Sequence, residues 1–501
     1  IKRRDSGRRW MKTQGQVSIT PPAMSARSYI GSGHFSIFLR VGFMSPSETA
    51  PEPPDYRAGR SRHLKCSAFR LWPILAIPLS MLATAAAAQE VIYETDRVRV
   101  EAGLDAASVV FFQRDSWFGE AQANIGVESG TWNEFAIEPQ LYLTIKDVLG
   151  GELTAGISAV ASQTFGESAE GFAAGIDDPG AATLEKLYVG WKAGFGADDF
   201  IEIMGGDFDY QIGTGFLIKD GGRDGGNRGG FYLGARSASR GSALARLQKG
   251  NLLLEGFWLG NNPGRSGIKA HVRGINAEYN FSERASIGAT YIEVAHFDDP
   301  VSGGVAEQLK TYDVRGAVSA TDRLTFSGEY AHQTGAEHYE GDGWYAQAKY
   351  KFADLPLEPT LSYRYAVVTG DDPSTSQNEA FVPLAYGFTD YAQWYQGELT
   401  GNWIFGNSNQ KTHLVKGTAS LSRAVSITTI WLDVALDDPR QLGVEDDDFG
   451  NEFNVILDWE ASDQLFLSAA VAVLVPGAAA KEFTGGNNTW AHLMLYASFS
   501  F

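Results

Sequence analysis

Positively charged side chains recur at alternate positions in several segments of this 501-residue sequence. The strongest candidates for binding are Arg364, Arg315 and Arg246, followed by Lys186 and Lys416, and the acids Asp313 and Glu398 share the same polar faces. Arginine binds a carboxylate through two parallel hydrogen bonds, and rings of charged side chains determine which ions a pore passes. These residues could therefore hold an anion that sheds its water. The alternative is that each cation pairs with an acid on a neighbouring strand and serves the structure alone.

Arg364 lies in a segment, Pro356 to Val368, whose side chains alternate strictly in character. One face carries Leu357, Pro359, Leu361, Tyr363, Tyr365 and Val367, and the other carries Glu358, Thr360, Ser362, Arg364 and Ala366. This pattern predicts a strand with one apolar and one polar face. In a soluble sheet the apolar face would rest on a core. In an outer-membrane barrel it would meet lipid, and Arg364 would point into a water-filled lumen.

Segments that read as strands recur along the chain, and through its first two-thirds the connections between them alternate between short and long. There are nineteen such segments: 97–112, 133–146, 151–165, 182–194, 200–212, 242–249, 252–259, 270–281, 284–297, 310–320, 323–333, 343–352, 356–368, 393–405, 411–421, 424–436, 449–459, 464–475 and 490–501. Bacterial barrels usually have an even number of strands. Two short connections in succession place the surplus segment between Gln393 and Ala424. We therefore expect an all-β fold, a transmembrane antiparallel β-barrel of about 18 strands that is closed by the C-terminal strand.

The last segment is the strongest indication of this class. Ala491, Leu493, Leu495, Ala497, Phe499 and Phe501 fall on one face, and Phe501 is the last residue of the sequence. A terminal Phe on an alternating strand resembles the signal that the outer-membrane assembly machinery reads.

The N-terminal part has the features of a targeting segment. Arg62, Lys65 and Arg70 precede an apolar run from Leu71 to Leu82, which is too short to span a bilayer and ends in Ala85-Ala86-Ala87-Ala88-Gln89. Residues 64–88 are therefore expected to be a signal peptide that is cleaved after Ala88. Residues 1–63 are basic and without periodicity, and we interpret them as an over-extended N-terminus. Residues 89–501 would form the barrel.

Removing residues 1–88 makes the chain strongly acidic. That segment holds 13 of the 41 basic and 4 of the 60 acidic residues, so 28 basic and 56 acidic residues remain, a net charge of −28. This excludes nucleic acid as a natural partner. The one cysteine, Cys66, lies in the signal segment, so the mature chain has neither a disulfide nor a cysteine nucleophile.

Two long connections are candidates for closing the lumen. Gly213 to Gly241 is too rich in glycine for a strand interior and lacks the spacing of a nucleotide-binding loop, so we expect it to fold over or into the barrel. Val368 to Tyr391 is long, polar and rich in aspartate. One of these loops should occlude the lumen, because a wide barrel otherwise leaks small solutes.

Several motifs together resemble one family, the alginate export family of outer-membrane porins, over nearly the whole mature chain. They are Trp132-Asn133-Glu134 with Pro139, and the stretches 184–191, 210–218, 232–236, 312–316, 361–365, 370–373, 379–384 and 396–398. The chain departs from the family at Asp207, where Gly205-Gly206-Asp207 replaces Gly-Arg-Gln, and at Val382, where Phe-Val-Pro-Leu replaces Phe-Asp-Pro-Leu. The resemblance implies a polyuronate pore with an electropositive constriction.

The function expected from these observations is passive export or diffusion of an anionic polysaccharide or oligosaccharide, alginate-like, through an Arg/Lys-lined lumen. A general porin, or a porin for another substrate, is the main alternative. A barrel-embedded hydrolase is a further one, but no convergent Ser/His/acid set or G-x-S-x-G motif is found, and a structural or adhesive barrel is the third. We expect no enzyme activity, cofactor or metal. The expected partners are the saccharide, outer-membrane lipid and lipopolysaccharide, the assembly machinery and periplasmic export proteins.

Overall fold

The computed structural model describes residues 90–126, 130–166, 179–221, 228–261, 269–298, 307–335, 338–385 and 395–501. The predicted signal peptide and N-terminal extension lie outside these residues. None of the helices in the described part of the chain has the length and apolar character needed to cross a membrane.

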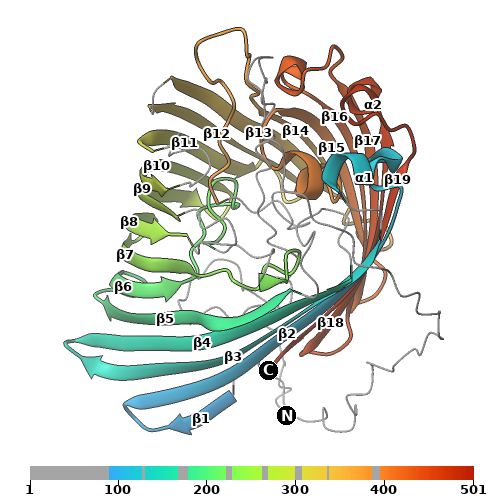
Figure 1. Cartoon of the computed structure of the whole chain (residues 1–501). Coiled ribbons are helices and arrows are strands. Elements are labelled where there is room, and N and C mark those ends of the chain that lie inside the picture. The colour runs from blue at the N-terminus through green and yellow to red at the C-terminus, as the bar shows by residue number, and fades with distance from the viewer. Residues whose placement is uncertain are drawn as a thin grey trace, which may run out of the picture. The chain divides into compact units, whose positions relative to one another are not determined.

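The described residues form a closed antiparallel barrel of eighteen strands, β2 to β19, with one extra strand (Figure 1). Each strand pairs with its neighbours in sequence, and β19 pairs with β2 to close the ring. The extra strand β1 folds back as a hairpin onto the start of β2. The strands are β1 Glu90–Glu94, β2 Val98–Arg114, β3 Thr131–Val148, β4 Gly151–Gly166, β5 Gly180–Gly194, β6 Phe200–Phe208, β7 Ser239–Lys249, β8 Leu252–Gly260, β9 Lys269–Ser282, β10 Ala285–Asp298, β11 Leu309–Ser319, β12 Leu324–Gly335, β13 Tyr339–Lys351, β14 Thr360–Val368, β15 Gln410–Ser420, β16 Val425–Ala435, β17 Asp448–Glu460, β18 Leu465–Pro476 and β19 Trp490–Ser500. The two α-helices are α1 Ala121–Ile125 and α2 Ala478–Thr484.

Alternating side chains give each strand two different faces, as the sequence predicts. In β14, Leu361 and Tyr363 are exposed on the outer surface, whereas Ser362 and Arg364 are buried on the inner side. In β3, Phe135 and Leu141 point outward, and Glu138 and Gln140 point inward. The exposed apolar side chains on the outer surface are those expected to meet lipid. The predicted all-β barrel is therefore confirmed.

The segment Gln393–Phe405 is the one wrongly predicted strand, which confirms that the surplus lies between Gln393 and Ala424. Its described part turns inward and forms a short π-helical segment, Thr400–Phe405. Tyr395, Leu399 and Trp403 are almost completely buried inside the barrel. Their spacing of four fits one face of a strand as well as one face of a helix, so periodicity alone cannot distinguish the two.

Connection lengths differ between the two ends of the barrel. Short turns such as Leu149-Gly150 and Gly250-Asn251 lie at the end where β2 begins and β19 finishes, and long connections lie at the other end. Short turns are typical of the periplasmic side and long loops of the extracellular side of outer-membrane barrels.

Three connections fold into the barrel from the long-loop end, where Figure 1 shows green and orange segments within the ring of strands. Residues 209–238 and 369–385 contribute Ile212, Phe216 and Phe381 to one buried apolar cluster with the inner wall of β7 to β14. Residues 395–409 join Phe231 and Tyr232 in a second cluster, against the inner wall of β2, β3 and β15 to β19. The described parts of both predicted loops thus pack inside the lumen, together with the described part of the segment that was misread as a strand.

Candidate functional site: the charged inner wall

All seven residues predicted for the site face the interior of the barrel. Arg364, Arg315, Arg246, Lys186, Lys416 and Asp313 lie on inward positions of β14, β11, β7, β5, β15 and β11 respectively. Glu398 lies instead in the inward-folded segment, immediately before the π-helical turn. These residues are distributed around the wall and do not converge on one point.

Lys186 is held between two acids from different parts of the chain. Its Nζ atom lies 2.9 Å from Asp209 and 3.5 Å from Glu138 of β3, and its side chain is almost completely buried. Ser158 of β4 donates a hydrogen bond to Glu138 at 2.6 Å. Because Asp209 begins the inward connection 209–238, this ion pair ties that connection to the wall.

Arg246 occupies a similar position two strands further on. Its guanidinium group contacts Glu202 of β6 at 3.2 Å and also binds Glu255 of β8. Glu255 in turn accepts hydrogen bonds from Tyr210 at 3.0 Å and Asn276 at 2.8 Å. The cation is thus matched by two carboxylates.

Arg315 and Asp313 form the centre of a third polar cluster. Arg315 donates to Asp313 at 2.8 Å, to Glu278 of β9 at 2.6 Å and to Thr290 of β10 at 2.7 Å. Glu329 of β12 lies opposite Arg315 in the strand register and accepts hydrogen bonds from Thr214 and Tyr345. Carboxylates again outnumber cations in this part of the wall.

Arg364 is covered by the inward-folded segment. Its side chain is fully buried, its guanidinium donates to the backbone oxygen of Tyr395, and it lies 5.8 Å from the ring centroid of Tyr345. Glu398 of the same segment accepts hydrogen bonds from Tyr232 at 3.3 Å and Asn402 at 3.2 Å, and lies 3.6 Å from His492. In this conformation both residues hold the interior segment in place.

Lys416 belongs to a part of the wall with a different composition. In the strand register Lys416 of β15 lies opposite Ser362 of β14, which lies opposite Lys349 of β13. Arg364 lies two residues after Ser362 and therefore on the same inner face of β14. The inner faces of three adjacent strands, β13 to β15, thus each carry one of these cations. Lys349 is exposed and Lys416 half-buried. The inner faces of β13, β14, β15 and β16, which the structure describes in full, carry no Asp or Glu. We refer to these three cations, together with the inner faces of β13 to β16, as the basic wall.

Sequence reasoning missed several charged residues of the interior. Arg240 binds Glu185 at 2.8 Å and Asp207 at 3.0 Å, so the residue that departs from the family pattern is the partner of an arginine. Arg236 is fully buried and donates to Ser162 and to the backbone oxygen of Ala181, both at 2.9 Å. The motif 232–236 already pointed to Arg236, whereas no pattern in the sequence marked Arg240.

Glu452 of β17 is the other residue that was missed. It is completely buried and accepts hydrogen bonds from the backbone nitrogens of Leu399 at 3.0 Å and Thr400 at 2.8 Å, and from the Thr400 hydroxyl at 2.8 Å. A carboxylate at the start of a helical turn satisfies backbone donors that would otherwise be buried without a partner. Glu452 therefore anchors the segment that covers Arg364.

At the long-loop end, an exposed ion pair joins two connections. Arg440 binds Asp372 at 2.9 Å and also binds Asp438. Hydrogen bonds from Ser374, together with Arg440, lower the pKa of Asp372 below its ordinary value. This contribution to folding is present at neutral pH and is lost as the pH falls through the lowered pKa.

Two kinds of inner wall therefore surround the lumen. On β5, β7 and β11 the cations Lys186, Arg246 and Arg315 are each matched by two carboxylates, whereas the inward strand positions of β13 to β16 carry no Asp or Glu. The described residues include no group of three or more His, Cys, Asp or Glu side chains that could hold a metal ion. The arrangement is suited to attracting and positioning a charged solute.

Comparisons with known proteins give one family match, over part of the chain. The alginate export family matches residues 273–491, a segment that holds Arg315, Arg364, Lys416, Asp313 and Glu398. The motifs before residue 273 lie outside that match. No curated protein matches the sequence.

Solved structures with a similar fold come from Pseudomonas aeruginosa. They are OccK5 (OpdH), with a TM-score of 0.54 and 10% identity, OccK7 (OpdD), with 0.51 and 13%, and OpdQ, with 0.51 and 11%. Each comparison covers 80% of this chain, and 98%, 98% and 97% of those chains respectively. At these identities the likeness establishes the fold alone. The chain is thus a porin-like β-barrel of the bacterial outer membrane, and its residues 273–491 match the alginate export family.

Proposed function

We propose that the barrel is a passive pore for an anionic polysaccharide or oligosaccharide of the polyuronate type, and that the basic wall guides this solute. The basic wall is the observation that carries the proposal. It lies entirely within the segment that matches the alginate export family. Arg364, Arg315, Arg246, Lys186 and Lys416 remain the residues proposed to line the path, with Lys349 added to them.

The physical reason is the cost of dehydrating carboxylates. A polyuronate that enters a narrow lumen loses water from each acidic group, and a lysine or arginine replaces part of that hydration. Weak contacts to several cations suit transport better than one tight site, because conduction requires that the solute also leaves. Lys349 and Lys416 lie toward the short-turn end of their strands and are not covered by the apolar clusters.

Transport of a polymer also requires the interior segments to move. Buried apolar side chains of residues 209–238 and 395–405 occupy the lumen toward the long-loop end in the described conformation. Connection 209–238 is tied to the wall by the ion pair between Lys186 and Asp209. Segment 395–405 is held by Glu452 and by the bond from Arg364 to Tyr395.

A second candidate function follows from the other wall. Lys186, Arg246 and Arg315 are each matched by two carboxylates, and these six carboxylates give that side an excess of negative charge. Such a wall favours neutral or cationic solutes. A general porin for these solutes is therefore the alternative.

Current block in planar bilayers distinguishes the two functions. Short oligouronates added to the short-turn side should block the ionic current through wild-type barrels, and uncharged oligosaccharides of equal length should block it much less. Lys349→Gln and Lys416→Gln should each weaken block by roughly threefold, the effect expected for a partly exposed ion pair. Arg114→Gln is the matched control, because Arg114 is an exposed cation at the rim. Equal block by charged and uncharged oligosaccharides would favour the general porin.

The remaining expectations extend this proposal beyond the barrel. We propose that residues 64–88 direct secretion and are removed, and that residues 1–63 are not part of the mature protein. The assembly machinery, lipopolysaccharide and periplasmic export proteins are the proposed partners. Amino-terminal sequencing of the protein from outer membranes would test the cleavage after Ala88.

A further inference from the structure

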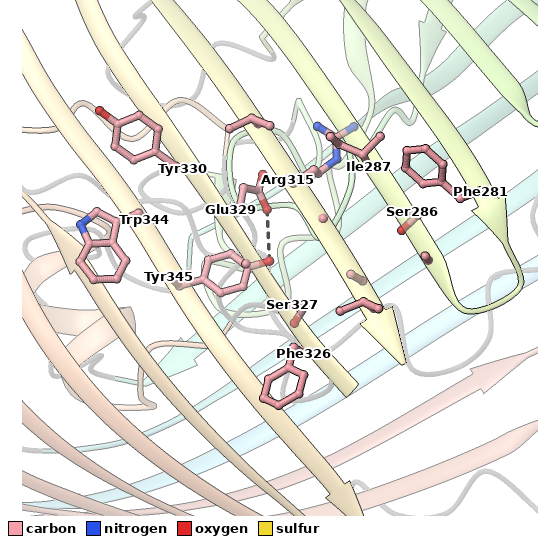
Figure 2. A pocket seen from close by; sticks show the side chains of 16 residues that line it. Phe281, Ser286, Ile287, Arg315, Phe326, Ser327, Glu329, Tyr330, Trp344 and Tyr345 are labelled. Atoms are coloured by element: carbon pink, nitrogen blue, oxygen red, sulfur yellow. Dashed lines mark hydrogen bonds between the residues drawn. The ribbon is translucent and has the colours of Figure 1, made fainter. Parts of the chain in front are cut away.

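The lipid-facing surface of β10 to β13 contains a groove with a volume of about 840 Å³. Its walls are large apolar side chains, among them Phe281, Ile287, Val314, Phe326, Tyr330 and Trp344 (Figure 2). All of these side chains except Trp344, which is partly buried, are more than a third exposed on the outer face of the barrel. The groove therefore opens toward the surrounding membrane and not toward the lumen. The groove is shallow and open along its outer side, so it suits a chain that lies along the surface and not a ligand enclosed by the protein.

Strand register explains why the surface is hollow at this place. Gly316, Gly328 and Ala346 are direct neighbours across β11, β12 and β13 on the outer face. A Cβ atom on Gly316 would meet no side chain, and its nearest neighbour would be the Ser286 oxygen at 3.3 Å. The row on the long-loop side holds Val314, Tyr330 and Trp344, and the row on the other side begins with Val318 and Phe326. Small residues thus form the floor between two bulky rows.

The groove lies near the short-turn end of the barrel, and two arginines lie beside it. Phe281 precedes the β9–β10 turn that contains Arg284, and Phe326 follows the β11–β12 turn that contains Arg323. Arg284 pairs with Asp322 and Arg323 with Asp354. The side chains of Arg284 and Arg323 are 59% and 42% exposed, so each guanidinium has donors left for a second anion.

We propose that this groove binds one phospholipid of the periplasmic leaflet. An acyl chain would lie over Gly316 and Gly328 between the aromatic rows, and the lipid phosphate would accept hydrogen bonds from Arg284 and Arg323. The turns place the headgroup at the periplasmic side, so the ligand comes from that leaflet and is not lipopolysaccharide of the outer one. A second copy of the chain fits less well, because a symmetric contact would bring Arg284 and Arg323 close to the same two arginines of the other copy, where like charges repel.

Native mass spectrometry of the full barrel in detergent tests the proposal. After delipidation, wild-type protein is titrated with phosphatidylglycerol, and the fraction of barrels with one bound lipid is measured. Gly316→Leu should lower the lipid affinity by about tenfold, because its side chain displaces roughly two methylene groups from the groove. Ala469→Leu on the outer face of β18 is the matched control and should leave the affinity unchanged.

The headgroup contact is tested separately by Arg284→Gln combined with Arg323→Gln. This variant should retain less phosphatidylglycerol than wild type while remaining a folded, heat-modifiable barrel. Equal lipid retention by wild type and Gly316→Leu would overturn the proposal. The wild type could instead form dimers without bound lipid, and Gly316→Leu could abolish these dimers. That result would show that a second copy of the chain occupies the groove, and it would also overturn the proposal.

Discussion

At the scale of single residues, Arg364 and Lys416 face the same lumen on adjacent strands but have different surroundings. Arg364 is completely buried and supports the interior segment through the backbone oxygen of Tyr395. Lys416 is half-buried and borders the exposed Lys349 across Ser362. The two cations should therefore differ in what their removal changes.

We predict that Arg364→Ala raises the conductance, because it releases the segment that fills the lumen. Lys416→Gln should leave the conductance near that of wild type and shift the ion selectivity toward cations. Single-channel recordings in symmetric and asymmetric KCl measure both properties. An unchanged conductance in Arg364→Ala would show that Arg364 does not hold the segment in place.

The inward orientation of these residues could be predicted, but their partners could not. Period-two alternation fixes which face of a strand Arg315 occupies. Its contacts with Glu278 of β9 and Thr290 of β10 depend on the register between three strands, which a single sequence does not specify. For the same reason the acid-free composition of the basic wall emerged only when β13 to β16 were seen side by side.

At the scale of elements, the strands were predictable because each one alone shows its alternation, whereas the interior segments were not. Tyr395, Leu399 and Trp403 pack against the inner wall of the barrel. The same side chains could also form the apolar face of a strand, so their pattern does not identify an interior segment. The described residues 209–221 and 228–238 have little regular structure, so only the length and the glycine content of this connection indicated a loop. The prediction that this loop folds inward rested on the size of the barrel.

Glu452 provides a test of whether segment 395–405 closes the lumen. Glu452→Ala removes three hydrogen bonds to Leu399 and Thr400. A hydrogen bond to a charged group contributes about 1.5–3 kcal/mol, so the open probability should rise by at least about tenfold. Glu460→Ala, at the exposed end of the same strand, is the control. If the recordings of Glu452→Ala and wild type coincide, segment 395–405 does not close the path, and the connections 209–238 and 369–385 are the remaining candidates.

At the scale of the whole molecule, the barrel depends on the seam between its first and last strands. Phe501 and Leu104 exchange two backbone hydrogen bonds of 2.8 and 2.9 Å, at the end of the β19–β2 ladder. Phe501 is the last residue of the apolar outer face of β19. The seam therefore ends with an aromatic side chain and two backbone contacts.

Deleting Phe501 should reduce the yield of folded barrel, because both hydrogen bonds and the terminal aromatic ring are lost. The folded fraction is measured as the heat-modifiable band on gels of isolated outer membranes. Phe501→Trp keeps the backbone contacts and an aromatic ring, and should assemble almost normally. Normal assembly of the deletion variant would show that β19 closes the barrel without its last residue.

The central claim is that the basic wall, and not the net charge of the chain, sets the selectivity of the pore. Residues 89–501 carry a net charge of −28, but salt screens distant loops within about 10 Å at 0.1 M ionic strength, whereas the cations of the lumen act on every permeating ion. Substitution of Arg246 or Arg315 would also leave acids unpaired. Lys349 and Lys416 are therefore the more direct probes.

The most direct measurement is the reversal potential of the purified barrel in a planar bilayer under a KCl gradient. We predict an anion-selective wild type, a clear shift toward cation selectivity in the Lys349→Gln/Lys416→Gln double variant, and no shift in Arg114→Gln. A cation-selective wild type would contradict the account and support a porin for neutral or cationic solutes.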